Sequence, residues 1–141
     1  MNTALQTSQS AGAEVVSPLI DVTILSFGAN VTDCKVLAGN ETAAIAFGDG
    51  SLALIDLAGL ETDPAAATRS LPLHRVACTA LCPLGAGIVS AGQDGRVVVI
   101  DDPGADRGRE IWSADGAWIE ALRVHEDGCL VAIAVGTGVH I

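Results

Sequence analysis

Basic residues are scarce in this chain. Seven Lys and Arg stand against seventeen Asp and Glu, which gives a formal net charge of −10. This scarcity disfavours binding to DNA, RNA and anionic membrane surfaces, because those partners need cations to neutralise their phosphates. A basic partner surface is compatible with the acidic balance, and the net charge also keeps an apolar chain in solution.

Aromatic side chains are also rare. They make up 3% of the 141 residues, whereas half of all residues are apolar. A composition dominated by small and β-branched residues suits tightly stacked sheets better than an aromatic ligand pocket. The length is sufficient for one domain with a substantial core.

Long hydrophobic runs are missing as well. No stretch approaches the roughly 20 consecutive apolar residues of a membrane helix. Residues 1–14 contain no Lys or Arg and no apolar run, so they resemble neither a signal peptide nor a transit peptide. We therefore expect a soluble, cytoplasmic protein. We also expect residues 1–14, which are rich in Ser, Thr, Gln and Ala, to form a disordered tail.

The four cysteines show no pattern typical of a zinc site. Cys78 and Cys82 are close in sequence, but no other Cys or His pair has the spacing that completes a tetrahedral site. Disulfides are not expected in a chain without a secretory signal. We predict that Cys34, Cys78, Cys82 and Cys129 are reduced and buried as small hydrophobic residues.

Familiar catalytic patterns are absent from the sequence. It has no Gly-x-Ser-x-Gly elbow, no HExxH pattern and no phosphate-binding Gly loop. His125, Glu126 and Asp127, or Asp101, Asp102 and Asp106, could hold a metal, but both sets are more typical of solvated loops. We therefore predict no catalytic, cofactor-binding or metal-binding residues. Trp112 and Trp118 fit either a recognition patch or packing between sheets, and we expect packing.

A hairpin pattern occurs twice in the sequence and a third time in weaker form. Residues 47–56 and 92–101 each contain an Asp-Gly turn followed by an apolar run, with another apolar run just before the turn segment, and residues 135–141 form the weaker copy. Asp and Gly tolerate the positive φ angles that tight hairpin turns require. A period of roughly 40 to 45 residues is typical of propeller blades.

The rest of the chain also reads as short strands and turns. The apolar run Val97–Ile100 does not alternate with polar residues, which is typical of strands covered on both faces. We expect residues 58–70 and 102–108 to form loops. The strands are expected at 21–27, 33–37, 42–47, 51–57, 77–82, 88–92, 96–101, 110–113, 118–124, 130–135 and 138–141. A β-sandwich with chance similarity between its hairpins is the alternative.

Residues 73–101 resemble a WD repeat. In that family a Gly-His dipeptide opens the repeat, and a Ser-containing strand, an Asp-Gly turn and a closing Trp-Asp follow. His74, Ser90, Asp94 and Asp101 match this pattern by position. Leu73 and Ile100 depart from it, because they stand where the family has Gly and Trp. A quinoprotein-like propeller is the neighbouring possibility.

The resemblance implies a structural role for the matching polar residues. In the family, His, Ser and Asp form a hydrogen-bonded network that fixes the strands of a blade. It implies that His74, Ser90 and Asp94 form such a network here, with Asp49 at the corresponding turn of the first copy.

The resemblance further implies an all-β fold of antiparallel four-stranded propeller blades. We expect about three blades within residues 15–141, at roughly 21–70, 71–113 and 114–141, with the last truncated and the ring incomplete. Such a chain is a fragment, a truncated product or a subunit that completes its ring by oligomerising. The apolar face of the third hairpin, with Val131, Ile133 and Val135, is expected to lack a neighbour.

The leading functional hypothesis is a non-catalytic protein-interaction scaffold. We expect a protein partner, or self-association through the open blade ends, and no nucleic acid or membrane partner. One alternative is a propeller enzyme, either a metal-dependent hydrolase or a quinoprotein-like dehydrogenase. Another is a truncated, non-functional fragment of a longer propeller.

Overall fold

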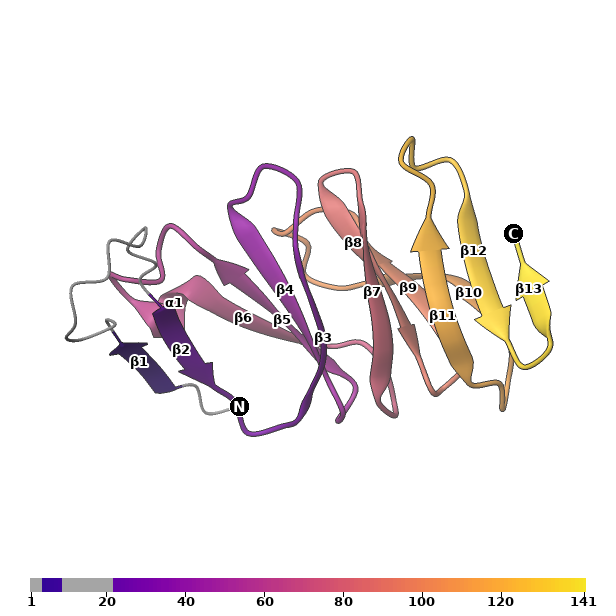
Figure 1. The fold of residues 1–141 in the computed structure, drawn as a ribbon, viewed down its shortest axis with the longest axis horizontal. Coiled ribbons are helices and arrows are strands. Elements are labelled where there is room, and N and C mark those ends of the chain that lie inside the picture. The colour runs from indigo at the N-terminus through magenta and orange to yellow at the C-terminus, as the bar shows by residue number, and fades with distance from the viewer. Residues whose placement is uncertain (1–3, 9–21) are drawn as a thin grey trace, which may run out of the picture.

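The fold is all-β and antiparallel, as the sequence predicts. The structure is a computed structural model that describes residues 4–8 and 22–141 (Figure 1). Within these ranges it contains thirteen strands and one short helix. They are β1 (Ala4–Ser8), β2 (Val22–Ser26), β3 (Val31–Val36), β4 (Thr42–Phe47), β5 (Ser51–Asp56), α1 (Pro64–Ala67), β6 (Thr68–Pro72), β7 (Cys78–Leu84), β8 (Gly87–Gly92), β9 (Arg96–Ile100), β10 (Arg109–Ser113), β11 (Ile119–Val124), β12 (Val131–Val135) and β13 (Gly138–His140).

Three sheets follow one another along the chain. Sheet I contains β3–β6, sheet II contains β7–β10 and sheet III contains β11–β13, each with its strands in sequence order. β1 and β2 form a separate two-stranded sheet. Contacts between neighbouring sheets are concentrated on their first strands, so β3, β7 and β11 lie side by side (Figure 1).

The two Asp-Gly turns close hairpins in sheets I and II. Gly50 has a φ of 87° and Gly95 a φ of 74°, in the left-handed region that glycine tolerates. Their N–H groups donate to the carbonyl oxygens of Phe47 and Gly92. The β4–β5 and β8–β9 hairpins therefore form where the sequence predicts them.

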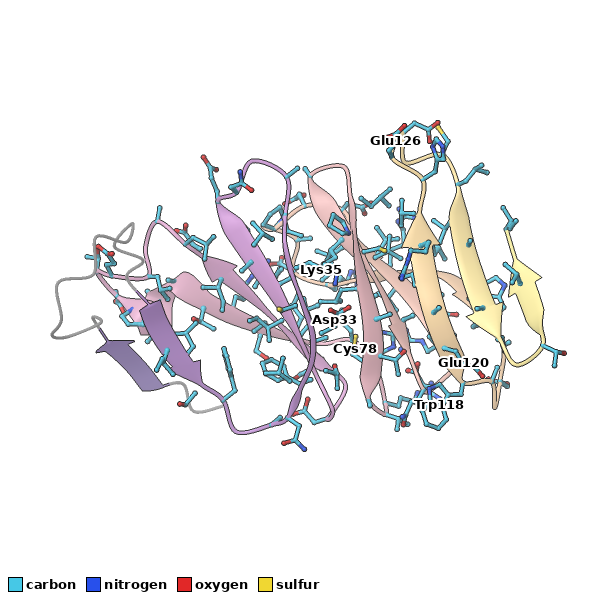
Figure 2. All side chains as sticks on the ribbon, viewed as in Figure 1. Asp33, Lys35, Cys78, Trp118, Glu120 and Glu126 are labelled. Atoms are coloured by element: carbon cyan, nitrogen blue, oxygen red, sulfur yellow. The ribbon has the colours of Figure 1, made fainter. Side chains whose placement is uncertain are left out.

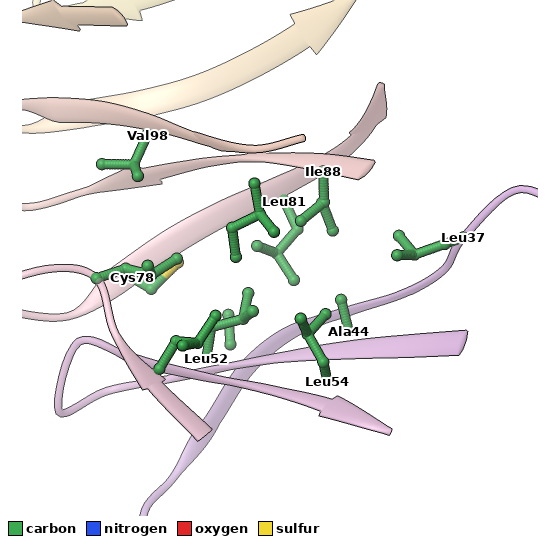
Figure 3. Packing of buried hydrophobic residues seen from close by; sticks show 12 residues of the cluster. Leu37, Ala44, Leu52, Leu54, Cys78, Leu81, Ile88 and Val98 are labelled. Atoms are coloured by element: carbon green, nitrogen blue, oxygen red, sulfur yellow. The ribbon is translucent and has the colours of Figure 1, made fainter. Parts of the chain in front are cut away.

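Sheet II is the centre of the stack, because both of its faces are covered. All six residues of β8 are buried. One apolar cluster fills the space between sheets I and II and includes Leu52, Leu54, Leu81 and Ile88 (Figure 3). A second cluster lies between sheets II and III. Strands buried on both faces carry continuous apolar runs, which explains the sequence of β9.

The structure differs from the predicted loop at residues 58–70. Asp63 caps the helix α1 by accepting a hydrogen bond from the N–H of Ala66, and the chain then pairs β6 with β5. β6 is the outermost strand of sheet I, and Leu71 is its one buried residue. A polar edge strand of this kind, ending at Pro72, lacks the apolar pattern by which strands are recognised.

The third hairpin packs differently from the expectation. Val131, Ile133 and Val135 join the apolar cluster between sheets II and III, so this face of β12 does have a neighbour. The prediction was wrong about which face is covered. Residues alternate between the two faces of a strand, and the uncovered face carries Ala132 and Ala134.

The predicted tail at residues 1–14 falls mostly outside the described residues. Within it, Ala4–Ser8 forms β1, which pairs with β2.

Candidate functional site

A buried histidine connects three segments around sheet II. His74 lies in the segment that leads from β6 to β7, and its side chain is fully buried. Its Nδ1 atom is 3.0 Å from Oδ1 of Asp94, and its Nε2 atom is 2.8 Å from Oγ of Ser90. The backbone N–H of His74 donates to the carbonyl oxygen of Gly50, in the β4–β5 turn. The structure thus brings His74, Ser90 and Asp94 together at the junction of sheets I and II.

Asp94 accepts hydrogen bonds with both carboxylate oxygens. Oδ2 accepts from the backbone N–H of Arg75 at 3.0 Å, and Oδ1 accepts from that of Arg96 at 3.2 Å. Burial by itself raises the pKa of Asp94, but the hydrogen bonds from Arg75 and His74 outweigh it and the pKa is lowered. Asp94 is therefore ionised at neutral pH.

The ionised carboxylate determines the protonation of His74. Because Asp94 can only accept, Nδ1 of the imidazole carries a hydrogen and donates it. Burial lowers the pKa of His74, although Asp94 opposes this effect, so the ring is neutral at neutral pH. The neutral ring then accepts a hydrogen bond at Nε2 from the hydroxyl of Ser90.

The order Ser–His–Asp is also that of a nucleophilic triad, but the geometry here suits a structural role. Ser90 is completely buried, and its hydroxyl also lies 3.3 Å from the carbonyl oxygen of Val98. A nucleophile must be reached by its substrate. This group of residues therefore joins strands instead of presenting a reactive hydroxyl.

Gly92 allows the histidine to approach the sheet. A Cβ atom at this position would lie 2.5 Å from Nδ1 of His74 and 2.7 Å from Oδ1 of Asp94. Both distances are too short for real Cβ contacts, so only glycine fits beside this pair.

Sheet I has an aromatic pair where sheet II has the histidine. Phe27 packs on Phe47 with ring centroids 4.9 Å apart. Phe47 ends β4 just as Gly92 ends β8, so the two phenyl rings occupy the junction that His74 and Gly92 occupy in sheet II. Asp49 is not part of such a network, because the position of the histidine is taken by Phe27, and its Oδ1 accepts from the N–H and the hydroxyl of Ser51 within the same turn.

Sheet III has neither the histidine nor the aspartate. The carbonyl oxygen of Gly95 accepts from the N–H of Ala114, as Gly50 accepts from His74. Ala114 is therefore the counterpart of His74, and Thr137 occupies the position of Asp94 in the β12–β13 turn.

A second set of polar contacts links the first strands of the sheets. Each of these strands has a register shift at the same place, around Thr32, Thr79 and Glu120. The hydroxyl of Thr32 donates to the carbonyl oxygen of Cys78, and the hydroxyl of Thr79 donates to the carbonyl oxygen of Ile119. The bulge thus directs a side chain from one sheet onto the backbone of the next.

Asp33 strengthens the contact between β3 and β7. Its Oδ2 accepts the N–H of Leu81 at 2.9 Å, and its Oδ1 lies 2.8 Å from Nζ of Lys35 (Figure 2). Burial raises the pKa of Asp33, but the hydrogen bonds from Lys35 and Leu81 lower it by more. Nothing in the hairpin pattern singles out this residue, so its role is not predicted from the sequence.

Arg69 holds the loop between β9 and β10 against sheet I. Its guanidinium donates to the carbonyl oxygens of Pro103, Gly104 and Ala105. The carboxylates predicted to lie in a solvated loop do so. Asp101 and Asp102 are exposed, and Asp101 pairs with Arg109 at 2.9 Å.

A cleft of about 420 Å³ opens between a turn of sheet II and a turn of sheet III. The β7–β8 turn and the β11–β12 turn form its walls, and Asp101 lies at the end of β9 beside them. The cleft is lined by Pro83, Leu84, Gly85, Ala86, Asp101, Val124, His125, Glu126, Asp127 and Gly128. Figure 2 shows Glu126 at the tip of the β11–β12 turn. His125 and Asp127 pair at 2.7 Å, and Oδ1 of Asp127 also accepts from the N–H of Cys129.

The tryptophans and cysteines lie partly where expected. Trp112 packs against the cluster between sheets II and III and lies 5.1 Å from the ring of His140, measured between centroids. Trp118 is 58% exposed, so the expectation of packing is wrong for this residue. All four cysteines are free, but only Cys78 is buried. Cys82 is partly buried and Cys34 and Cys129 are exposed, which corrects the prediction that all four are buried.

Among the described residues, no group of three or more His, Cys, Asp or Glu side chains could hold a metal ion. None of the helices in the described ranges has the length and apolarity needed to cross a membrane.

No protein-family model matches the chain, and no curated protein matches it.

Proposed function

We propose that this chain is a non-catalytic protein-interaction module built from WD-repeat-like propeller blades. Sheets I and II are four-stranded meanders stacked through their first strands, which is how blades follow one another. The contacts of His74 with Ser90 and Asp94 support the resemblance, because the family's network joins the same residue types at the same positions.

The observation that carries this proposal is the cleft between the β7–β8 and β11–β12 turns. Its walls are hairpin turns whose strands belong to the packed clusters of sheets II and III, so they form a preorganised surface. Pro83, Leu84 and Val124 contribute apolar side chains to its lining, and Glu126 lies at the tip of the β11–β12 turn that forms one wall. A partner's side chain can insert there without a large rearrangement.

The charge of the cleft indicates the chemistry of its partner. Asp101, Glu126 and Asp127 contribute three carboxylates, of which Asp101 is paired with Arg109, and the whole chain carries a net charge of −10. Such a field attracts cationic segments and raises their association rate at low salt. We therefore expect a short protein segment that places Lys or Arg beside an apolar residue.

Titration with a synthetic peptide that alternates Lys and Leu tests this proposal. Isothermal calorimetry and backbone amide shifts should report binding that maps to residues 83–86 and 124–128 and weakens as salt is added. Glu126→Gln should reduce the affinity several-fold, because it removes a rim charge. Glu61→Gln, at an exposed carboxylate outside the cleft, is the matched control and should bind as the unmodified chain does. Equal affinities for both variants, or shifts elsewhere, would refute the cleft as the binding site.

A further inference from the structure

The uncovered face of sheet III repeats the pattern by which sheet II packs on sheet III. In sheet II, three cross-strand neighbours form a row in the apolar cluster against sheet III. They are Ala80, Ala91 and Val97. In sheet III, the corresponding cross-strand neighbours are Ala121, Ala134 and Val139. Each row begins at the residue after the bulge in the first strand of its sheet, which is at Thr79 in sheet II and at Glu120 in sheet III. The two rows have the same composition.

The row of sheet III is not covered by the described residues. Val139 is 65% exposed, whereas its counterpart Val97 is completely buried. Ala121 and Ala134 are only partly buried. The row is therefore built like a sheet-packing surface, and no sheet within residues 4–8 and 22–141 packs on it.

The other end of the stack presents the complementary surface. On the side of sheet I that faces away from sheet II, β3 exposes Cys34, Val31 (54%) and Val36 (52%). In the other two sheets, the corresponding side of the first strand packs on the preceding sheet. Those residues are Cys78 and Leu81 in sheet II and Ile119 and Leu122 in sheet III. One chain thus carries both halves of one kind of interface.

We propose that sheet III of one copy packs on sheet I of a second copy, with the row Ala121–Ala134–Val139 covering the exposed side of β3. This contact continues the stack that already joins sheets I, II and III. It uses two different surfaces, so it is head-to-tail, and repetition gives a closed ring or a filament. It lies outside the lining of the cleft and is independent of the function proposed for that cleft.

Electrostatics distinguishes this association from cleft binding. Each copy carries a net charge of −10, so copies repel one another at low salt, while the contact surface itself is mostly apolar. Added salt should therefore strengthen self-association, whereas it should weaken the binding of a cationic peptide in the cleft. The two proposals can fail separately.

Size exclusion with light scattering on the 141-residue chain, at micromolar concentration, tests the proposal. We expect an oligomeric mass that increases with salt. Val139→Glu should raise the apparent dissociation constant by about tenfold or more, because it places a charge in an apolar contact. Val76→Glu alters a valine that is 47% exposed between β6 and β7, outside both surfaces, and should leave the mass unchanged.

Mixing two variants then identifies which surfaces meet. Val36→Glu blocks the surface on sheet I, and Val139→Glu blocks the surface on sheet III. Each variant alone should be monomeric at the concentration where the unmodified chain associates. A mixture should form a heterodimer, because each copy keeps one intact surface of opposite kind. A monomeric unmodified chain would overturn the proposal, as would an oligomer that Val139→Glu does not weaken or a mixture that stays monomeric.

Discussion

Oγ of Ser90 lies 2.8 Å from Nε2 of His74, and this contact joins the second strand of sheet II to the segment that connects sheets I and II. The other imidazole nitrogen is held by Asp94, so one ring fixes a strand, a turn and a connection at once. Removing one partner from a buried network of this kind lowers the free energy of unfolding, because the remaining polar groups stay buried away from water without a hydrogen-bond partner. The stability of the chain should therefore depend strongly on these three residues.

Asp94→Ala should destabilise the chain more than Asp102→Ala. Asp94 accepts from His74 and from the backbone N–H groups of Arg75 and Arg96, and its loss leaves these donors unsatisfied. We expect a cost of about 1–3 kcal/mol. Asp102 is exposed and accepts one hydrogen bond from the N–H of Gly104 within its own loop. Urea denaturation measures the difference, and equal midpoints for the two variants would contradict the role assigned to Asp94.

Stability should fall as the pH drops below about 6.5, the ordinary pKa of histidine. Burial lowers the pKa of His74 in the folded state, so the unfolded chain takes up a proton more readily. The contribution of His74 to the free energy of unfolding is complete at pH values above its pKa in the unfolded chain. It is lost as the pH falls towards its lower pKa in the folded chain. Asp94, whose pKa is also lowered, acts in a separate and more acidic window, below about 3.8.

The free energy of unfolding in urea, measured between about pH 5 and pH 8, tests this pH dependence. His74→Gln should remove the change near pH 6.5, because glutamine does not titrate. His125→Gln, at a side chain that is 53% exposed, serves as the control and should retain the change. A flat profile for the unmodified chain would show that His74 does not titrate differently in the two states.

The hairpins could be predicted because their signals are local, whereas the contacts of His74 were expected only from the resemblance to a WD repeat. Asp-Gly turns specify backbone angles, and the apolar runs beside them specify burial on both faces. β6 could not be predicted in this way. Three of its five residues are polar, and it forms a strand only because the free edge of β5 lies beside it, which is a tertiary effect.

The contacts of Asp33 and Arg69 were also beyond the sequence. Asp33 meets Leu81, and Arg69 meets the loop at Pro103, only after separate sheets have stacked. The bulges at Thr32 and Thr79 have the same origin, since no residue type marks a bulge. The face of β12 was mispredicted because alternation shows that two faces exist but not which one meets sheet II.

Gly50→Ala should cost more stability than Gly39→Ala. The two glycines have nearly identical φ angles of 87° and 88°, so alanine suffers about the same strain of roughly 1–2 kcal/mol at each. A Cβ at Gly39 meets nothing within 4 Å. At Gly50 it would lie 2.2 Å from the carbonyl oxygen of His74 and 2.4 Å from that of Val76, so the turn must separate from the connection to sheet II.

The extra cost at Gly50 should be about 1–3 kcal/mol, the usual range for forced overpacking. The difference between the two thermal or urea transitions isolates the contact between sheets I and II from the backbone strain. Equal destabilisation by both substitutions would mean that the β4–β5 turn does not rest on the His74 segment.

Thiol alkylation should separate the cysteines by exposure. Cys34 and Cys129 are exposed and should react rapidly with iodoacetamide. Burial raises the pKa of the Cys78 thiol to about 12, so this residue has almost no reactive thiolate at neutral pH. Intact mass spectrometry should therefore show rapid addition of two groups, and Cys34→Ser combined with Cys129→Ser should abolish this phase. Cys78 lies in the cluster between sheets I and II, so the rate of its slow reaction reports how often those sheets separate. If Cys78 is modified as fast as Cys34, the interface between sheets I and II is open in solution.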